Sequence, residues 1–261
     1  MSNNDDLTIR MKAYEAVSDI HLMRRTPVIV RLDGKNFSNF TRSMKKPFDS
    51  AFKMCMTAVA KRLCAEAQNC RMAFHGSDEI SLLLVDYRTL TTSPWFDNDV
   101  MKVTSVSAAI ATAAFAEELL SQGVFDVKNK RFPVFDSRCF NVPERDVVNY
   151  FVWRQRDIMR NSVSAAAQSV FSHKDLQGVN RDQMIDMLKL RRGIDWNDYG
   201  HHFRRGSVII RDAEVLGNVT RHRWVEHAAP LFKDDRQYVE KFLHVDDSDV
   251  YVLNDKVDKA T

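Results

Sequence analysis

Hydrophobic and polar positions alternate in a way that predicts strands and helices in turn through the first half of the chain. In the segment 26–37, alternate residues face opposite sides of a strand, so that Leu32 shares one face with its apolar neighbours while Arg31 and Asp33 share the other. The segment 47–69 repeats apolar residues at helical spacing, with Asp49 or Ser50 as the capping residue at its start.

Two further strands, a helix and a last strand follow in the same half. Arms near 71–75 and 79–86 predict a hairpin, 98–121 predicts an alanine-rich helix, and 131–140 predicts a strand. The succession strand, helix, strand, strand, helix, strand is the βαββαβ order of the ferredoxin-like split fold. We therefore expect an α+β protein in which the first strand and the central hairpin are neighbours in one antiparallel sheet.

The pattern changes near Pro143. Residues 142–261 are mostly helical in pattern, with one late strand in "GSVIIR" (206–211) and an acidic tail that we expect to be loosely ordered. The sequence thus predicts a catalytic domain over 1–141 and an appended, mostly helical region over 142–261 that packs on it.

Composition limits the class of protein without identifying it. Hydrophobic residues make up 44% of the 261 positions, which is enough for a real core and excludes a disordered chain. The net charge of +3 (38 − 35) is only mildly basic, so local clusters matter more than total charge for binding nucleic acid. The N-terminus lacks a signal-peptide pattern, and the alanine-rich segment 108–116 is too short to span a membrane, so we expect a cytoplasmic protein with no membrane partner.

The cysteines and the paired histidines do not predict a metal site. None of the four cysteines belongs to a CxxC pair, and two of them lie in an apolar helical pattern, which predicts free thiols in a reducing compartment. His201 and His202 lack a third metal ligand at usable spacing, so we expect no zinc site there.

Carboxylates at a strand end and at a hairpin turn are the strongest chemical signal. "FHGSDEISLLL" (74–84) places Asp78 and Glu79 at the hairpin turn, and Asp33 ends the first strand just before Gly34. In the expected sheet these ends meet, and two aspartates beside glycine-containing turns are suitable oxygen ligands for Mg²⁺. Two such ions about 4 Å apart can hold the attacking and leaving oxygens of a phosphoryl transfer. Ordinary turn formation explains the same residues without a ligand, and Glu79 faces the opposite side of its strand, as an ion-pair partner would.

Phosphate-binding groups surround these carboxylates in the sequence. Backbone amides of the loop 34–38 can cradle a triphosphate, and Lys46 and Lys102 can neutralise its charge, although single lysines are more often solvated surface residues. In the helical half, Arg154 and Asn161 share one face and suit contacts with an RNA backbone. The alternative is an intrahelical Arg154–Asp157 pair on a solvated surface.

Four motifs in order resemble the tRNA-histidine guanylyltransferase superfamily. They are "RLDGKNFSNF" (31–40), "GSDEISLLL" (76–84), "WRQRDIMRN" (153–161) and "FRRGSVII" (203–210), and they extend the resemblance over residues 25–211. The resemblance implies a polymerase/cyclase-type palm that adds nucleotides in the 3′–5′ direction. A tRNA 5′ end is first activated, and the 3′-hydroxyl of an incoming nucleoside triphosphate then attacks its α-phosphate.

The resemblance also assigns residues, cofactors and partners. It implies two Mg²⁺ ions, ATP and GTP as substrates, tRNA as partner, and a homotetramer. The implied catalytic residues are Asp33, Asp78 and Glu79; the metal ligands are Asp33, Asp78 and the carbonyl of Gly34; the nucleotide-binding residues are Asp33, Gly34, Lys35, Asn36, Phe37, Ser38, Lys46, Ser77, Asp78 and Lys102; and the tRNA-binding residues are Arg154, Asn161, Arg204 and Arg205. The residues alone, without the resemblance, leave two interpretations of Arg204 and Arg205: they contact phosphates, or they simply flank an edge strand.

One departure from the family bears on the substrate. Eukaryotic members carry a His where this chain has Met159, in a helix associated with selecting the histidine tRNA. The sequence therefore favours template-dependent repair of 5′-truncated tRNAs, with guanylylation of tRNA-histidine at position −1 as the alternative. A palm-type nucleotide cyclase and a catalytically inert RNA-binding relative are the other two hypotheses. A cyclase would have no use for the spaced arginines of the helical half, and an inert relative would be expected to have lost one carboxylate.

Overall fold

A six-stranded antiparallel sheet forms the centre of the protein. The computed structural model describes residues 6–89, 91–123, 133–216 and 219–244, and in these residues the strand order is β4-β1-β3-β2-β5-β6. The strands are β1 (Val28–Lys35), β2 (Cys70–Gly76), β3 (Glu79–Leu84), β4 (Val134–Asn141), β5 (Ser207–Leu216) and β6 (Val219–Ala228). Each pair of neighbours in the sheet is antiparallel.

Helices connect the strands and extend beyond the sheet. The α-helices of the described residues are α1 (Asp6–Glu15), α2 (Phe37–Phe40), α3 (Ser50–Glu66), α4 (Val100–Ser121), α5 (Glu144–Gln168), α6 (His173–Leu176), α7 (Arg181–Arg192), α8 (His201–Arg205) and α9 (Gln237–Glu240). Short 3-10 helices lie at η1 (Ala16–Ser18), η2 (Thr41–Ser43), η3 (Trp95–Asn98) and η4 (Trp196–Asp198). The α+β class is confirmed, and β1, α3, β2, β3, α4 and β4 follow one another in the predicted order.

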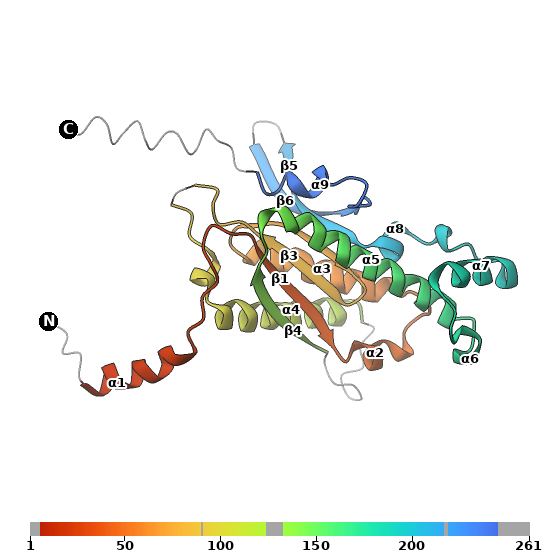
Figure 1. Cartoon of the computed structure of the whole chain (residues 1–261), viewed down its shortest axis with the longest axis horizontal. Helices are drawn as coiled ribbons and strands as arrows, with labels where there is room; N and C mark the ends of the chain where they lie inside the picture. Colours follow the sequence, from red (N-terminus) through yellow and green to blue (C-terminus); the bar gives the residue numbers. More distant parts are fainter. Residues whose placement is uncertain (1–5, 90, 124–132, 217–218, 245–261) are drawn as a thin grey trace.

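Helices cover both faces of the sheet, and α5 lies across one of them (Figure 1). Leu32 of β1 packs in the core that α3 and α4 form on one face, together with Val59 and Phe115. Ile29 packs in the core on the other face, together with Phe151 of α5. The alternation of β1 is therefore the predicted one, and Arg31 and Asp33 lie on the α5 side because they share the face of Ile29.

Helix α4 lies within the predicted helix 98–121, but its apolar stretch is longer than the segment 108–116 that the sequence analysis considers. Its 22 residues are enough, by length and composition, to cross a membrane, so the expectation that this segment is too short was wrong. In the structure Val103, Ala111 and Phe115 pack one side of the helix into the sheet core. A core helix of this kind passes the same test of length and composition.

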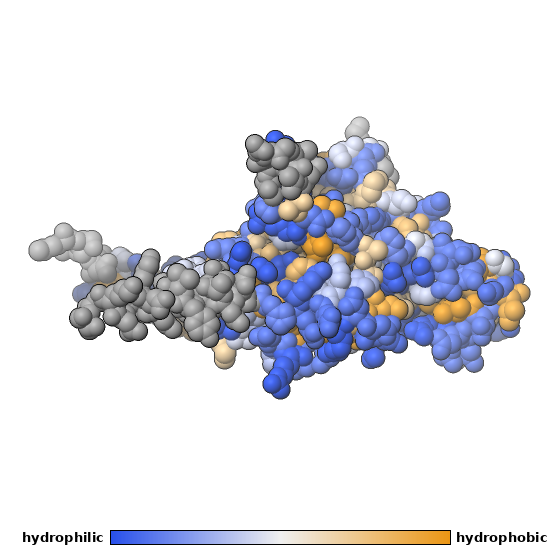
Figure 2. Space-filling model, turned by 90° about the horizontal axis from the view of Figure 1, so that it is seen from above, coloured by the Kyte–Doolittle hydropathy of each residue, from blue (hydrophilic) through white to orange (hydrophobic). Residues whose placement is uncertain are grey.

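The second half of the chain contains more sheet than predicted. β5 pairs with β2, and β6, which the sequence analysis missed, pairs with β5, so that one sheet continues through residues of both halves. The division at residue 141 stays a prediction. A separate small core, including Val163 and Trp196, joins the far part of α5 to α7 and η4. The face shown in Figure 2 is mostly hydrophilic, with smaller hydrophobic areas that include the end where α6 and α7 lie.

Candidate active site

The end of β1 meets the turn of the β2–β3 hairpin. Asp33 lies directly opposite Glu79 of β3 and opposite Asp136 of β4 in the strand registers. The next residue, Gly34, donates its backbone N–H to the carbonyl oxygen of Asp78 at 3.1 Å. This hydrogen bond fixes the strand end against the turn, as the sequence predicts.

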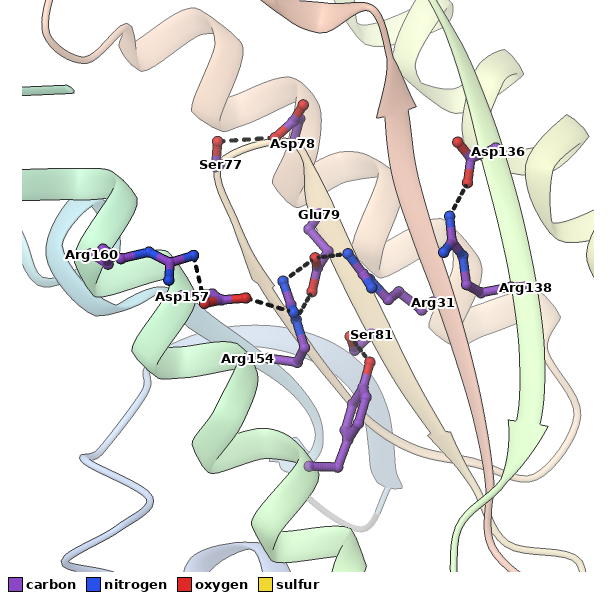
Figure 3. Close-up of polar contacts among 11 residues, drawn as sticks. Arg31, Ser77, Asp78, Glu79, Ser81, Asp136, Arg138, Arg154, Asp157 and Arg160 are labelled. Atoms are coloured by element: carbon purple, nitrogen blue, oxygen red, sulfur yellow. Dashed lines mark hydrogen bonds and ion pairs between the residues drawn. The ribbon is translucent and has the colours of Figure 1, made fainter. Parts of the chain in front are cut away.

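The turn itself holds Asp78 through its neighbour. Ser77 has a φ of 55°, in the left-handed region that a side chain makes unfavourable. Its hydroxyl donates to Oδ1 of Asp78 at 3.0 Å (Figure 3). Figure 3 shows Asp78 at the tip of the hairpin, apart from the network of arginines around Glu79. The strained turn thus presents a half-buried carboxylate at the edge of the sheet.

Asp33 carries the electrostatic signature of a crowded acidic site. Burial, together with the negative charges of Asp78 and Glu79, raises the pKa of Asp33 to about 6, and Arg31 opposes this rise only in part. Carboxylates that repel one another at a cleft are stabilised by a bound cation. The oxygen donors of Asp33 and Asp78 therefore fit Mg²⁺, which takes carboxylate, carbonyl and water ligands.

Glu79 is different, because arginines compensate its charge. Arg154 of α5 donates to both of its carboxylate oxygens at 2.6 Å, and Arg31 of β1 lies 2.7 Å from Oε2 (Figure 3). The side chain is buried and both oxygens are occupied. The catalytic role implied for Glu79 does not suit this position. The ion pairs of the alternative interpretation are present, and the charge of Glu79 joins β3 to β1 and α5, whereas its catalytic role stays a prediction.

Arg154 is also corrected by the structure. Its side chain is only 7% exposed, and besides Glu79 it donates to Asp157 at 2.8 Å. Neither a contact with tRNA phosphates nor a solvated intrahelical pair describes it. The predicted pairing with Asp157 exists, but inside the protein and as part of the Glu79 network.

A cleft of about 490 Å³ opens beside Asp78, between the α2–α3 segment, the far part of α5 and α8. Its lining includes predicted site residues, namely Phe37, Ser38, Lys46, Ser77, Asp78 and Asn161. It also includes lysines and aromatic residues that no prediction assigned to the site, namely Lys45, Lys53, Phe48 and Phe203. The cleft therefore has an acidic corner and several cations along its wall, which suits a polyanion that binds together with metal ions.

The loop after β1 is shaped by a close contact. A Cβ placed on Gly34 would lie 2.4 Å from the ring of Phe37, so only glycine fits there. Phe37 is buried among aromatic rings that include Phe115 and Phe135, and it anchors the loop to the core. Asn36, with a φ of 60°, precedes the short helix α2, and Lys35 is exposed. Phe37 is therefore an anchor whose burial leaves Lys35, Asn36 and Ser38 exposed.

Several predicted residues do not join the cleft. Lys102 lies at the start of α4 beside Asp99, at 3.5 Å, near the end of β4 and away from the Asp33 end of β1. Its predicted nucleotide contact does not suit that place. Arg204 donates to the carbonyl of Tyr199 at 2.7 Å, and Arg205, next to it in α8, is half-buried. Neither arginine is among the described residues that line the cleft.

Aromatic residues on one wall are the contribution that sequence reasoning missed. Phe48 stacks on Phe203, with ring centroids 4.9 Å apart and an angle of 12° between the rings, and Tyr199 meets Phe48 edge-on at 5.0 Å. This stack joins the segment before α3 to α8. The available signal was "KKPF" (45–48), a basic pair next to an aromatic residue, but its partner lies 155 positions away in the sequence (203 − 48).

Comparisons with known proteins show the family of this chain. The family model described as tRNAHis guanylyltransferase matches residues 8–143, which is more than half of the chain. Solved structures of a bacterial tRNA(His) guanylyltransferase (Thg1)-like protein, in complex with ATP and with GTP, are 36% identical; both cover 92% of this chain and 100% of theirs, with TM-scores of 0.84 and 0.81.

Curated relatives are more distant in sequence, and those with a named activity belong to the same family. An uncharacterized protein of Acanthamoeba polyphaga mimivirus is 26% identical over 97% of this chain and 95% of its own. The tRNA(His) guanylyltransferase of Saccharomyces cerevisiae is 27% identical over 72% of this chain and 84% of its own. With a family model over half of its length and a 36% identical relative over nearly all of it, this chain belongs to the tRNAHis guanylyltransferase family, whose members are nucleotidyltransferases.

Proposed function

We propose that this nucleotidyltransferase adds nucleotides to the 5′ end of tRNA in the 3′–5′ direction, with its sheet serving as a polymerase-type palm. The observation that carries the proposal is the pair Asp33 and Asp78, whose charges repel each other and which form no ion pair with an arginine among the described residues. Asp78 also lines a cleft whose wall includes lysines. The ATP and GTP complexes of the 36% identical bacterial protein support nucleoside triphosphates as substrates.

Each group of residues in and beside the cleft has a separate task in this proposal. Asp33, Asp78 and the carbonyl of Gly34 would hold two Mg²⁺ ions, which when bound stabilise negative charge on the reacting phosphate oxygens. Lys46 and Lys53 neutralise and orient the triphosphate. The buried Glu79–Arg154 pair holds the hairpin against α5, so that Asp78 stays at the rim of the cleft.

The names of the relatives favour one substrate. The curated relatives with a named activity are tRNA(His) guanylyltransferases, which supports addition of G at position −1 of tRNA-histidine as the first candidate reaction. Repair of 5′-truncated tRNAs is the second candidate, and Met159 favours it. Met159 is half-buried and packs against the small core of Val163 and Trp196, so it offers an RNA base no hydrogen-bond donor.

One assay tests the activity and separates the substrates. Purified protein with Mg²⁺ is given triphosphorylated tRNA-histidine lacking G−1, or a panel of 5′-truncated tRNAs, with each nucleoside triphosphate in turn. Asp78→Ala is the negative control. We expect nucleotide incorporation at the 5′ end, and the ratio of kcat/KM between the two substrate classes decides between guanylylation and repair. Cyclic nucleotide formed without RNA would instead establish the cyclase hypothesis, and RNA binding without incorporation would establish an inert relative.

The homotetramer and the cytoplasmic location also remain proposals. Helix α1 has no buried residue in the single chain and exposes large apolar side chains, such as Ile9 (54% exposed) and Tyr14 (67% exposed). Exposed apolar area of this kind is typical of surfaces that associate. Light scattering at several protein concentrations tests the assembly.

A further inference from the structure

Three side chains from distant parts of the chain converge beside the cleft: His75 of β2, His202 of α8 and Glu226 of β6. One nitrogen of each ring and one carboxylate oxygen all lie within 4.8 Å of one another. Nε2 of His75 is 3.9 Å from Oε1 of Glu226, and Nδ1 of His202 is 3.5 Å from the same oxygen. We propose that this cluster binds one first-row divalent transition-metal ion, with Zn²⁺ as the expected occupant.

The sequence analysis expects no zinc site at His201–His202 because it finds no third ligand nearby, and the proposal departs from that expectation by joining His202 to ligands from other segments. Sequence spacing can identify only ligands that lie close together in the chain, and here the other two ligands come from distant segments. His75 arrives from β2 and Glu226 from β6, because β2, β5 and β6 are neighbours in the sheet and α8 leads directly into β5. His201, the other member of the pair, is exposed and lies outside the cluster.

The donor set selects the class of ion. Two imidazoles and one carboxylate suit zinc and its first-row neighbours, whereas Mg²⁺ prefers oxygen ligands. Bond lengths near 2.1 Å to nitrogen and oxygen place tetrahedral ligand atoms about 3.4 Å apart, so the distances of 3.5 and 3.9 Å need little contraction. Three protein ligands leave a fourth position for water, and His202 lines the cleft from which an ion can enter.

A second observation points to a ligand independently of these distances. His75 is completely buried, and within the described chain neither of its ring nitrogens has a hydrogen-bond partner. Buried polar atoms without a partner are rare in folded proteins, and an ion bound to Nε2 would satisfy this one. Burial also lowers the pKa of His75 to about 4 and that of His202 to about 2. Both rings are therefore neutral at neutral pH, the state in which imidazole binds metals.

Two groups compete with the ion, and one of them provides the sharpest test. Lys53 pairs with Oε2 of Glu226, and the hydroxyl of Ser207 lies 2.8 Å from Nδ1 of His202. The ammonium pairs with Oε2 while Oε1 faces the histidines, but its positive charge disfavours a cation nearby. Removing that charge should therefore strengthen metal binding, which a structural role of the histidines does not predict.

The experiment titrates Co²⁺, a spectroscopic substitute for Zn²⁺, into the chelator-treated full-length protein in excess Mg²⁺, and then displaces it with Zn²⁺. We expect the visible absorption of bound Co²⁺ to saturate at one equivalent per chain. The absence of a thiolate charge-transfer band would exclude the cysteines as ligands. Lys53→Gln should bind about tenfold more tightly. His202→Ala and Glu226→Gln should bind at least about tenfold more weakly. His201→Ala, one position away, is the matched control and should bind as the wild type does.

Either of two results would overturn the proposal. One is the absence of stoichiometric Co²⁺ binding in both the wild type and Lys53→Gln. The other is binding that His202→Ala and Glu226→Gln leave unchanged, which would place the ion elsewhere. Near-ultraviolet circular dichroism checks that each variant is folded. If the His202→Ala variant does not fold, the Co²⁺ affinity of Lys53→Gln decides between metal binding and a purely structural role.

Discussion

Asp78 and Glu79 are adjacent in the chain, but the protein pairs only the charge of Glu79 with arginines. Glu79 is buried, and two arginines from different elements occupy both of its oxygens. Asp78 stays at the rim of the cleft, beside Asp33, and accepts a hydrogen bond from the hydroxyl of Ser77. The first arrangement stabilises the fold, whereas the second leaves negative charge that a ligand can neutralise. An acid whose charge is neutralised by arginines of the protein thus suits a structural role, whereas acids left without such partners suit chemistry.

Removing either uncompensated carboxylate should have the largest effect. We expect Asp33→Ala and Asp78→Ala to lose nucleotide addition by roughly a thousandfold or more, because the lost metal clamping removes several kcal/mol of transition-state stabilisation. Incorporation into tRNA under single-turnover conditions measures this. Both variants should remain folded by circular dichroism. Near wild-type activity in either one would mean that the carboxylate is not a metal ligand.

Breaking the compensated pair should reduce stability. Arg154→Met leaves the buried carboxylate of Glu79 with Arg31 as its remaining ion pair, and we expect the free energy of unfolding to fall by about 3–5 kcal/mol. Urea unfolding measures the loss. Adding Glu79→Gln to Arg154→Met should restore part of it, since the buried carboxylate that has lost Arg154 is then replaced by a neutral amide.

The interpretation of Arg154 as a tRNA contact predicts a different outcome. In that case Arg154→Met would keep wild-type stability and lose tRNA affinity in a salt-dependent way. Arg156, which is exposed on the same helix, is the matched control, and Arg156→Met should leave stability unchanged. Unfolding free energies of the two variants that agree within about 0.5 kcal/mol would contradict the buried role of Arg154.

The sequence predicts the fold and the acidic corner better than the rest of the site, and the reason is locality. Alternation in 26–37 is a local property that places Asp33 on its face, and a hairpin turn brings Asp78 to the same edge whatever lies elsewhere. The burial of Arg154 depends on Glu79, 75 positions away, and helical periodicity cannot show which of several polar faces meets a partner.

Other misses have the same cause. Lys102 lies at the start of α4, beside the end of β4 and away from Asp33, a placement that a motif alignment does not reveal. The strand pattern of β6 is interrupted by the exposed polar residues Arg221, His222 and Arg223, which suit an edge strand. The His75–His202–Glu226 cluster needs three segments at once.

A smaller effect tests the cost of leaving Asp33 uncompensated. Its raised pKa means that the folded protein binds a proton there more tightly than the unfolded chain, so that ionised Asp33 destabilises the fold above about pH 6 and ceases to do so below about pH 4. We expect Asp33→Asn to raise the unfolding free energy of the metal-free protein by about 1 kcal/mol at neutral pH, after discounting for solvent screening.

The pH and metal dependence of that gain are its controls. Urea unfolding with chelator present should show the gain at neutral pH and lose it as the pH falls toward about 4, where the wild-type carboxyl is protonated. Adding Mg²⁺ should narrow the difference by stabilising the wild type, because the ion binds only when Asp33 is present. A stability loss in Asp33→Asn would show that the carboxylate is compensated after all.

The smallest effect concerns the turn that holds Asp78 apart from Glu79. Ser77 both donates to Asp78 and adopts a φ of 55°, so two substitutions separate its two tasks. Ser77→Ala removes the hydrogen bond and keeps the unfavourable backbone conformation, whereas Ser77→Gly removes the bond and relieves that conformation. We expect both to lower kcat about fivefold, since a hydrogen bond of about 1 kcal/mol orients the carboxylate, and Ser77→Gly to be about 1 kcal/mol more stable than Ser77→Ala. Equal stability of the two would mean that the turn carries no strain, and unchanged kcat in both would mean that Asp78 is oriented by the backbone bond to Gly34 alone.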